Sequence, residues 1–217
     1  MSNNIISEIF SNPIYDQTNN MVRWNGMHRI KDETVGHHTH IVTFFTRIIL
    51  EELFHDYPYE YTKNKVIADT MTYAIFHDFD ESFTGDIIHT FKHNKFNGKQ
   101  IRLNTTEYLN HIRDNIDVKT STHLMLKKFA FGPVGLKQFQ KDIVKISDWL
   151  SMMFYLKKES DLGNKLVAEK ITYCSNELLK VVSTLQLRVS QYMRKDVDFT
   201  IVSNLVEFLN NIKLKLS

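Results

Sequence analysis

The chain has 217 residues, a formal net charge of +2, 42% hydrophobic residues and 24% charged residues, the balance of an ordinary soluble globular protein. This length favours one compact domain over residues 1–217. The small net charge gives no reason to expect a nucleic-acid polymer as partner, and no apolar run is long enough to predict a membrane span. The N-terminus lacks a secretory signal, and Cys174, the one cysteine, cannot form an internal disulfide, so a cytoplasmic location is expected.

Helical periodicity dominates the chain. Only 7 glycines and 3 prolines interrupt it, which favours helices over a turn-rich β architecture. Apolar residues three or four positions apart predict helices over Thr34–His55, Lys63–His77, Gly98–Asp117, Thr120–Phe129, Leu136–Lys158, Leu162–Met193 and Phe199–Leu214. Gly132–Pro133 predicts a break between elements. No stretch alternates as strands do, so we predict an all-α, single-domain helical bundle.

Polar residues interrupt the apolar stripes of these helices. The first helix has one stripe with further apolar residues beside it (Val42, Phe45 and Ile49; Ile41, Phe44 and Ile48). His38 lies four residues before Val42, so helical geometry aims it at the core. His77 follows Ala74 by three residues, and Asp78 follows Ile75 by three, continuing what we expect to be a buried stripe.

Asp148 also shares a helix face with apolar neighbours, Val144 and Met152. A carboxylate is costly to bury unless it is paired, hydrogen-bonded or bound to a cation. Taken singly, an inward histidine is more often a hydrogen-bonded core residue, and an inward aspartate more often reaches water at an edge. Two imidazoles and two carboxylates on three helices instead indicate a site for a divalent ion such as Mn, Co, Fe, Zn or Mg.

The ordered set His38, His77-Asp78 and Asp148 resembles the H…HD…D signature of HD-domain phosphohydrolases. More narrowly, four segments resemble the bacterial 5′-deoxynucleotidases: Arg23-Trp24, E-T-V-G-H-H at 33–38, F-H-D-F-D-E-S-F-T-G-D at 76–86 and V-K-I-S-D at 144–148. The order and rough spacing match from about Arg23 to Leu156. The upstream Arg-Trp pair and H-D-x-x-E-x-x-T-G-D together make this resemblance specific.

The resemblance implies that His38, His77, Asp78 and Asp148 are ligands of one divalent metal ion, whose identity stays open. Two other histidines, His37 and His40, flank the first ligand and are candidates by composition alone; alignment with the family and the apolar stripe favour His38. Open coordination positions would remain for water and a substrate oxygen.

The resemblance also implies roles for residues around the metal. Glu81 would orient or deprotonate the attacking water. Arg23 would grip the phosphate, Trp24 would pack against the sugar and disfavour a 2′-hydroxyl, and Asp86 would accept a hydrogen bond from the sugar 3′-hydroxyl. The alternatives are a packing role for Trp24, a solvated surface charge for Arg23, and a turn or helix cap at Thr84-Gly85-Asp86. Family members are commonly dimers, so a homodimer is expected.

The function implied is a metal-dependent 5′-nucleotidase that removes phosphate from deoxyribonucleoside monophosphates. One alternative is a deoxynucleoside triphosphate triphosphohydrolase, because related small HD proteins, including phage-encoded ones, cut triphosphates. A non-catalytic nucleotide-binding regulator is a third hypothesis. No H-H-E-x-x-x-G-x-G-Y-P segment is present, which argues against a cyclic-dinucleotide phosphodiesterase. The segment 94–133 has no counterpart that aligns.

Overall fold

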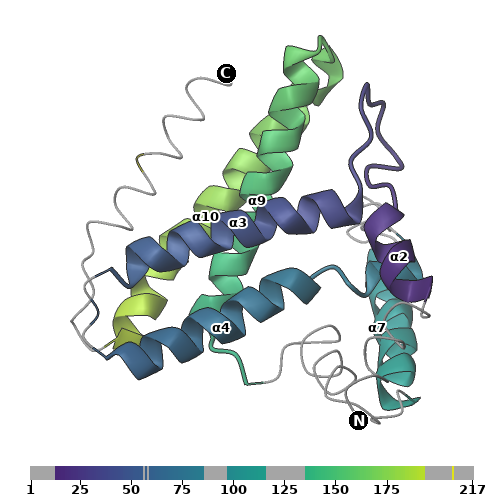
Figure 1. Ribbon diagram of the computed structural model, residues 1–217. Helices are drawn as coiled ribbons and strands as arrows, with labels where there is room; N and C mark the ends of the chain where they lie inside the picture. Colours follow the sequence, from purple (N-terminus) through teal and green to yellow (C-terminus); the bar gives the residue numbers. More distant parts are fainter. Residues whose placement is uncertain are drawn as a thin grey trace. The chain divides into compact units, whose positions relative to one another are not determined.

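The computed structural model describes residues 13–55, 57, 59–85, 97–115, 135–193 and 207 (Figure 1). These residues form α2 (Pro13–Asn20), α3 (Val35–Leu53), α4 (Glu60–Phe76), α5 (Glu81–Thr84), α7 (Gly98–Asn115), α9 (Gln138–Asp161), η1 (Lys165–Val167) and α10 (Ala168–Met193). Among them, β structure is limited to one isolated antiparallel bridge between Val22 and Thr34. The all-α prediction is therefore confirmed. No helix in this part of the chain is long and apolar enough to cross a membrane.

The periodicity predicted most helix bounds to within three residues. One prediction, a continuous helix from Leu162 to Met193, is wrong at its start. The chain leaves α9 at Asp161 and turns through Gly163, whose φ of 97° is a conformation that glycine adopts without strain. It then passes through η1, and α10 begins only at Ala168. The helix predicted over Thr120–Phe129, the break at Gly132–Pro133 and nearly all of the last predicted helix lie outside the described residues.

The chain falls into two compact units. The first draws on residues 1–28, 32–39 and 75–134, and the second on residues 29–31, 40–74 and 135–217. Both α3 and α4 contribute residues to each unit. The prediction of one domain over the whole chain stays a prediction.

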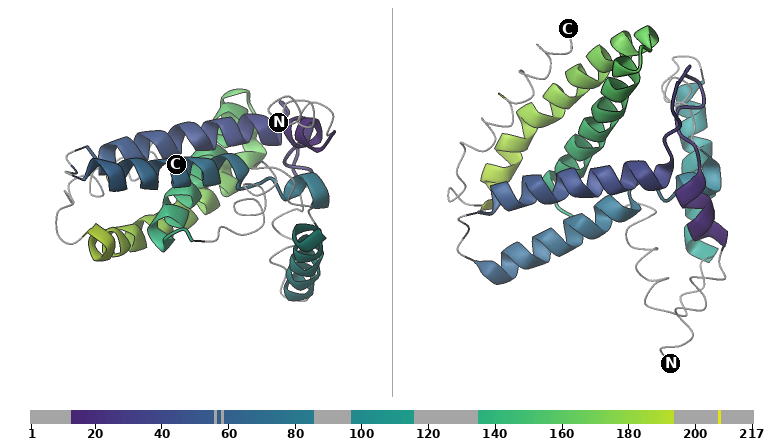
Figure 2. Two further views of the ribbon diagram at one scale, coloured as in Figure 1. Left: turned by 60° about the horizontal axis from the view of Figure 1, so that its bottom comes forward. Right: turned by 45° about the horizontal axis from the view of Figure 1, so that its top comes forward.

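The second unit contains the long helices α9 and α10, which run side by side (Figure 2). Residues at helical spacing on α10 are buried: Ile171, Cys174, Leu178, Val182, Leu185 and Val189. Val181, predicted on this stripe, is only partly buried, and its neighbour Val182 takes the buried position. Phe44 and Ile48, which lie beside the predicted apolar stripe of α3, are 57% and 44% exposed.

Buried polar side chains link the elements of the second unit. Gln140 Nε2 on α9 donates to Thr70 Oγ1 on α4 at 2.9 Å. Glu159, near the other end of α9, is fully buried and accepts hydrogen bonds from the backbone N–H groups of Ile30 and Lys31 at 2.7 and 2.8 Å. These donors satisfy a carboxylate that water does not reach.

The first unit is built around a short antiparallel pairing of two loop segments. The N–H of Val35 donates to the carbonyl of Met21, and the N–H of Arg23 donates to the carbonyl of Glu33, both at 2.8 Å. Thr34 Oγ1 then accepts from the N–H of His37 at 3.1 Å, the bond of a helix N-cap, and so begins α3. The pairing fixes where the chain enters α3, four residues before His38.

A glycine in the first turn of α3 allows α2 to approach closely. A Cβ atom at Gly36 would lie 3.0 Å from both the Cα and the carbonyl oxygen of Asn19, a separation at which α2 would have to shift. Helix α2 also contacts α5 in the same unit. The glycine of the E-T-V-G-H-H segment therefore has a packing role.

Candidate functional site

Two of the predicted metal ligands, His77 and Asp78, lie in a turn that follows α4. The N–H of Phe79 donates to the carbonyl of Phe76 at 3.1 Å, and the N–H of Glu81 donates to the carbonyl of Asp78 at 3.1 Å. The Phe79 ring is buried and packs edge-on against the Phe76 ring, with centroids 5.8 Å apart. His77 and Asp78 are thus held in place by a tight turn with an aromatic anchor.

This turn corrects the geometry on which the sequence argument rested. The helix ends at Phe76, so His77 and Asp78 do not continue a helical stripe. Ile75, expected to be buried on that stripe, is 50% exposed. The side chains of His77 and Asp78 are still turned inward, at 6% and 19% exposure, because the turn directs them there. The inward orientation of these two side chains was predicted, and their placement on a helix was wrong.

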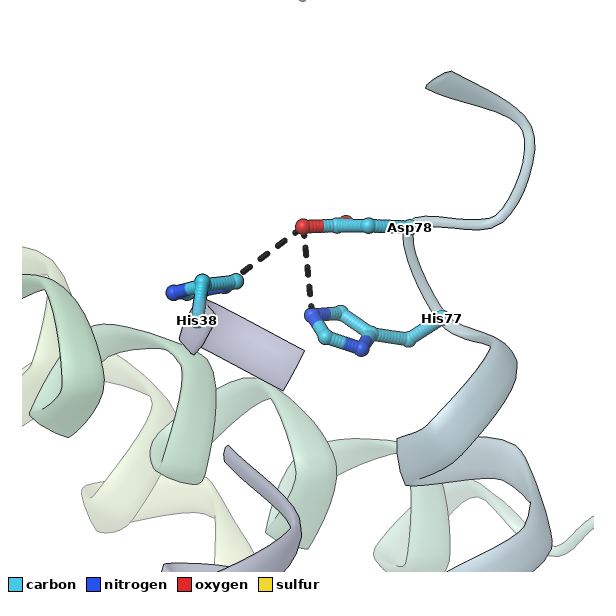
Figure 3. A group of neighbouring side chains, drawn as sticks. All are labelled: His38, His77 and Asp78. Atoms are coloured by element: carbon cyan, nitrogen blue, oxygen red, sulfur yellow. Dashed lines mark ion pairs between the residues drawn. The ribbon is translucent and has the colours of Figure 1, made fainter. Parts of the chain in front are cut away.

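Three of the four predicted ligands lie together in the first unit. Asp78 Oδ2 lies 3.4 Å from His38 Nε2 and 3.3 Å from His77 Nε2 (Figure 3). The three potential ligand atoms all lie within 4.8 Å of one another. His38 is fully buried, whereas the two alternative histidines, His37 and His40, are exposed and lie outside this group. The preference for His38 is therefore supported by burial and by proximity.

The spacing fits a single divalent cation. Two ligand atoms that each lie about 2.1 Å from one ion are separated by roughly 3.0–3.4 Å at octahedral or tetrahedral angles. The two nitrogen–oxygen separations in the cluster are of this size. A set of two imidazoles and one carboxylate suits borderline or hard divalent ions. His38, His77 and Asp78 are thus able to bind one metal ion, whose identity their chemistry leaves open.

Arg23 joins this cluster directly. Its Nη1 lies 2.5 Å from Asp78 Oδ2, and its side chain is only 11% exposed, so the alternative of a solvated surface charge is wrong. Burial by itself raises the pKa of Asp78. The positive charges of His77, Arg23 and His38 outweigh burial and hold that pKa well below its ordinary value. Asp78 is therefore ionised, as a metal ligand must be.

Trp24, the residue after Arg23, has an unusual backbone. Its φ of 66° lies in the left-handed region, which for a bulky residue costs about 1–3 kcal/mol and persists only where the surroundings enforce it. The indole Nε1 donates to Glu33 Oε2 at 2.8 Å, and Glu33 is only 2% exposed. Such strain beside a candidate site is typical of a residue held in one orientation for function.

Comparison with known proteins identifies the family of this chain. A family model described as "5′-deoxynucleotidase YfbR-like" matches residues 13–197. The chain belongs to this YfbR-like family. Among solved structures, an HD-domain phosphohydrolase from Listeria innocua is similar, at 16% sequence identity, a TM-score of 0.62 and coverage of 97% of each chain. No curated protein sequence matches this chain significantly.

Family and fold together make this YfbR-like protein a phosphohydrolase of the HD family. At 16% identity, the likeness to the Listeria protein concerns the fold. In this chain the His-His-Asp group could hold a metal ion. The predicted homodimer, the cytoplasmic location and the absence of a nucleic-acid partner stay predictions.

Glu81 is buried at the first position of α5. Helix α4 ends at Phe76, so His77 and Glu81 do not share one helix, and a turn separates them. Gly85 follows α5 with a φ of 73° and donates its N–H to the carbonyl of Glu81 at 2.8 Å, so Gly85 is a helix cap. Asp86 lies outside the described residues, and the catalytic role of Glu81 stays a prediction.

Asp148, the fourth predicted ligand, lies on α9 in the second unit. It is buried, and its Oδ2 accepts a hydrogen bond from Lys145 Nζ at 2.6 Å. The same ammonium group lies 4.8 Å from the centroid of the Trp149 ring. The role of Asp148 as a ligand stays a prediction of the sequence.

One residue of this site had no role in the sequence argument. Glu33 was part of the E-T-V-G-H-H segment, but a charged residue just before a helix usually lies in solvent. Its burial could not be predicted from its place in a loop. Its position in the E-T-V-G-H-H motif, next to a predicted helix start, could have marked it as a candidate site residue.

Proposed function

We propose that this YfbR-like protein hydrolyses deoxyribonucleoside 5′-monophosphates to a deoxynucleoside and inorganic phosphate. The observation that carries the proposal is the convergence of His38, His77 and Arg23 on the single carboxylate of Asp78. Such an arrangement would put a cation site next to an arginine that is able to bind phosphate. A phosphomonoester needs both, since its charge must be neutralised before water can attack.

His38, His77 and Asp78 would hold the metal ion. When bound, this ion supplies a lowered water pKa and shields the negative charge of the phosphate. Arg23 would bind the phosphate itself, because a planar guanidinium offers parallel N–H donors to two phosphate oxygens. The phosphate dianion would compete with Asp78 for this guanidinium when the substrate enters.

Glu81 would accept a proton from the attacking water as its oxygen bonds to phosphorus. The bond between phosphorus and the 5′-oxygen then breaks, and that oxygen leaves as the nucleoside hydroxyl after protonation. The products are inorganic phosphate and the nucleoside. Glu81 is buried at the first position of α5.

Trp24 would supply the preference for deoxyribose. The indole of Trp24 is partly buried, and its strained backbone and its hydrogen bond to Glu33 fix its position. A ring fixed beside the sugar C2′ would clash with a 2′-hydroxyl group. Asp86 would accept a hydrogen bond from the 3′-hydroxyl, as the family resemblance implies. Together these residues favour a deoxynucleoside monophosphate.

The test is a nucleotide screen on the metal-loaded protein, with products resolved by chromatography. We expect inorganic phosphate and deoxynucleosides from deoxynucleoside monophosphates, and slower turnover of the matched ribonucleotides. Tripolyphosphate released from deoxynucleoside triphosphates would support the triphosphohydrolase instead. Nucleotide binding without turnover would support the non-catalytic regulator. A His77→Ala variant, loaded and assayed identically, controls for a contaminating phosphatase.

A further inference from the structure

We infer that Glu33 is a positioning residue that fixes Trp24 and Arg23 together and thereby determines the sugar selectivity of the site. This inference rests on the proposed function, in which Trp24 contacts the sugar and Arg23 contacts the phosphate. Glu33 itself is not assigned a contact with substrate. It acts through the two residues that do.

The backbone places Glu33 beside these two residues. The N–H of Arg23 donates to the carbonyl of Glu33 at 2.8 Å, and the neighbouring residues Val22 and Thr34 form an antiparallel bridge. This pairing sets the register of the two segments, so the side chain of Glu33 emerges next to Arg23 and Trp24. Its location therefore follows from main-chain hydrogen bonds and does not depend on a flexible contact.

The carboxylate then contacts both side chains. Glu33 Oε2 accepts the indole N–H of Trp24 at 2.8 Å and lies 3.8 Å from Arg23 Nε. The other oxygen, Oε1, lies 3.8 Å from His37 Nδ1. Because Glu33 is only 2% exposed, water contributes little to its stabilisation, and these groups must supply it. The contacts are therefore expected to be maintained continuously.

Arg23 consequently lies between two carboxylates. Its Nη1 contacts Asp78 Oδ2 at 2.5 Å, and its Nε lies 3.8 Å from Glu33 Oε2, an ion-pair distance that is too long for a hydrogen bond. Two carboxylates on different sides of one guanidinium favour one orientation of its plane. When a phosphate displaces Asp78 from the guanidinium, Glu33 would still hold the other side of the plane.

Trp24 needs an anchor because its backbone is strained. A tryptophan with a φ of 66° would relax to an extended conformation unless another contact opposed this change. The hydrogen bond to Glu33 is such a contact, and it also sets the direction of the ring. A loosened indole would no longer occupy a fixed place beside the sugar, and ribonucleotides would gain access.

Two substitutions at Glu33 separate its two contacts. Glu33→Gln keeps an oxygen that accepts the indole N–H but removes the charge that faces Arg23. Glu33→Ala removes both. We expect Glu33→Gln to raise KM for deoxy and ribo substrates alike with little change in their kcat/KM ratio. We expect Glu33→Ala to lower the deoxy-to-ribo ratio by about fivefold, the scale of one lost hydrogen bond.

A double-mutant cycle tests whether Glu33 acts through the indole. Trp24→Phe keeps an aromatic ring but has no N–H donor. Adding Glu33→Ala to Trp24→Phe should not change the deoxy-to-ribo ratio further if the two residues act as one unit. A second, additive fivefold loss would overturn the inference.

A matched control is available in the second unit. Asp142 is also a buried carboxylate paired with an arginine, with 2.5 Å between Asp142 Oδ2 and Arg188 Nη1. Asp142→Asn should lower the melting temperature but leave the deoxy-to-ribo ratio unchanged. If it changes the ratio as much as Glu33→Ala does, the effect is one of general stability and the inference fails.

The positioning contact has a readout that requires no activity. The chain has two tryptophans, so Trp149→Phe assigns the indole N–H proton resonance of Trp24. Glu33→Ala should move this resonance upfield and speed its exchange with water, and Glu33→Gln should move it less. Failure of the proposed function would appear as a wild-type protein that hydrolyses no nucleotide, with these shifts still present. An unmoved Trp24 resonance in folded Glu33→Ala would overturn the inference itself.

Discussion

Two carboxylates in this protein, one fully buried and one partly buried, have different surroundings. Glu159, on α9, is fully buried and accepts the backbone N–H groups of Ile30 and Lys31 at 2.7 and 2.8 Å, with the side-chain amide of Asn164 at 2.9 Å. These three donors are neutral. Two of them are backbone N–H groups and the third is a side-chain amide. A cation could replace them only if the local structure were broken.

Asp78 is surrounded by groups that can be exchanged. Its Oδ2 faces the imidazoles of His38 and His77 and the guanidinium of Arg23, and its side chain keeps 19% of its surface exposed. A metal ion can bind where imidazoles and a carboxylate converge, and a phosphate can draw the arginine away. Burial alone therefore does not mark a functional carboxylate; the chemistry of its partners does.

The strongest test of this comparison replaces each carboxylate by its amide. Asp78→Asn removes a ligand charge, so bound metal should be lost and nucleotide hydrolysis should fall by at least about a hundredfold. Glu159→Gln should keep the metal but turn an amide N–H₂ towards backbone donors, at a cost of about 1–3 kcal/mol in unfolding free energy. Metal analysis and denaturant melts of both variants give the answer. If Asp78→Asn retained its metal, Asp78 would not differ from Glu159 as a metal ligand.

Glu81→Ala should have the next largest effect. Because Glu81 lies outside the His-His-Asp group, the variant should keep its metal while kcat falls by about a hundredfold, the usual scale for a general base. Metal content and turnover must be measured on the same preparation. If the metal is lost together with activity, Glu81 supports the ligands and does not act on water.

Arg23→Ala should lower kcat/KM equally for all substrates. Every nucleotide monophosphate carries the same phosphate, and one lost charge-assisted contact is worth about 1.5–3 kcal/mol, or roughly 10- to 150-fold in kcat/KM. The deoxy-to-ribo ratio should stay within about twofold of the wild type, since the indole of Trp24 remains. A selective loss of deoxynucleotides would assign Arg23 to the sugar instead. Arg23→Lys, which keeps the charge but not the paired donors, shows how much of the loss is geometric.

The smallest effect is expected at Cys174, which tests how stably α10 is packed. The thiol is buried on α10, and burial is the main cause that raises its pKa to about 12. Below that pH the folded protein should not react with a thiol reagent on the timescale of minutes, whereas the denatured protein should react at once. Rapid labelling of the native protein would show that this helix opens readily.

Much of this architecture could be predicted from the sequence, because long helices with a regular apolar stripe leave a strong pattern. The bounds of α3, α7 and α9 follow it closely. The pattern failed at the start of Leu162–Met193, where Gly163 with its positive φ and the short helix η1 precede α10 although apolar residues continue through this segment. The expectation that the helical stripe continues through His77 and Asp78 also failed. The turn there contains neither glycine nor proline, so the sequence did not indicate it.

The candidate site could be predicted in its residues but not in its contacts. Motif order selected His38, His77 and Asp78, and the structure brings those three together. The ion pair between Arg23 and Asp78 joins residues 55 positions apart, which no local pattern reports. Glu33 was missed for the same reason, because its burial depends on the pairing of two loop segments.

The central claim is that His38, His77 and Asp78 bind one divalent ion on which hydrolysis depends. The most direct measurement is a calorimetric titration of Mn²⁺ into metal-free protein, with deoxynucleoside monophosphate hydrolysis assayed at each point. We expect hydrolysis to rise in proportion to bound metal up to one ion per chain, and His38→Ala and His77→Ala to bind at least about tenfold more weakly. Full hydrolysis in the metal-free protein, or unchanged binding in both variants, would contradict this account.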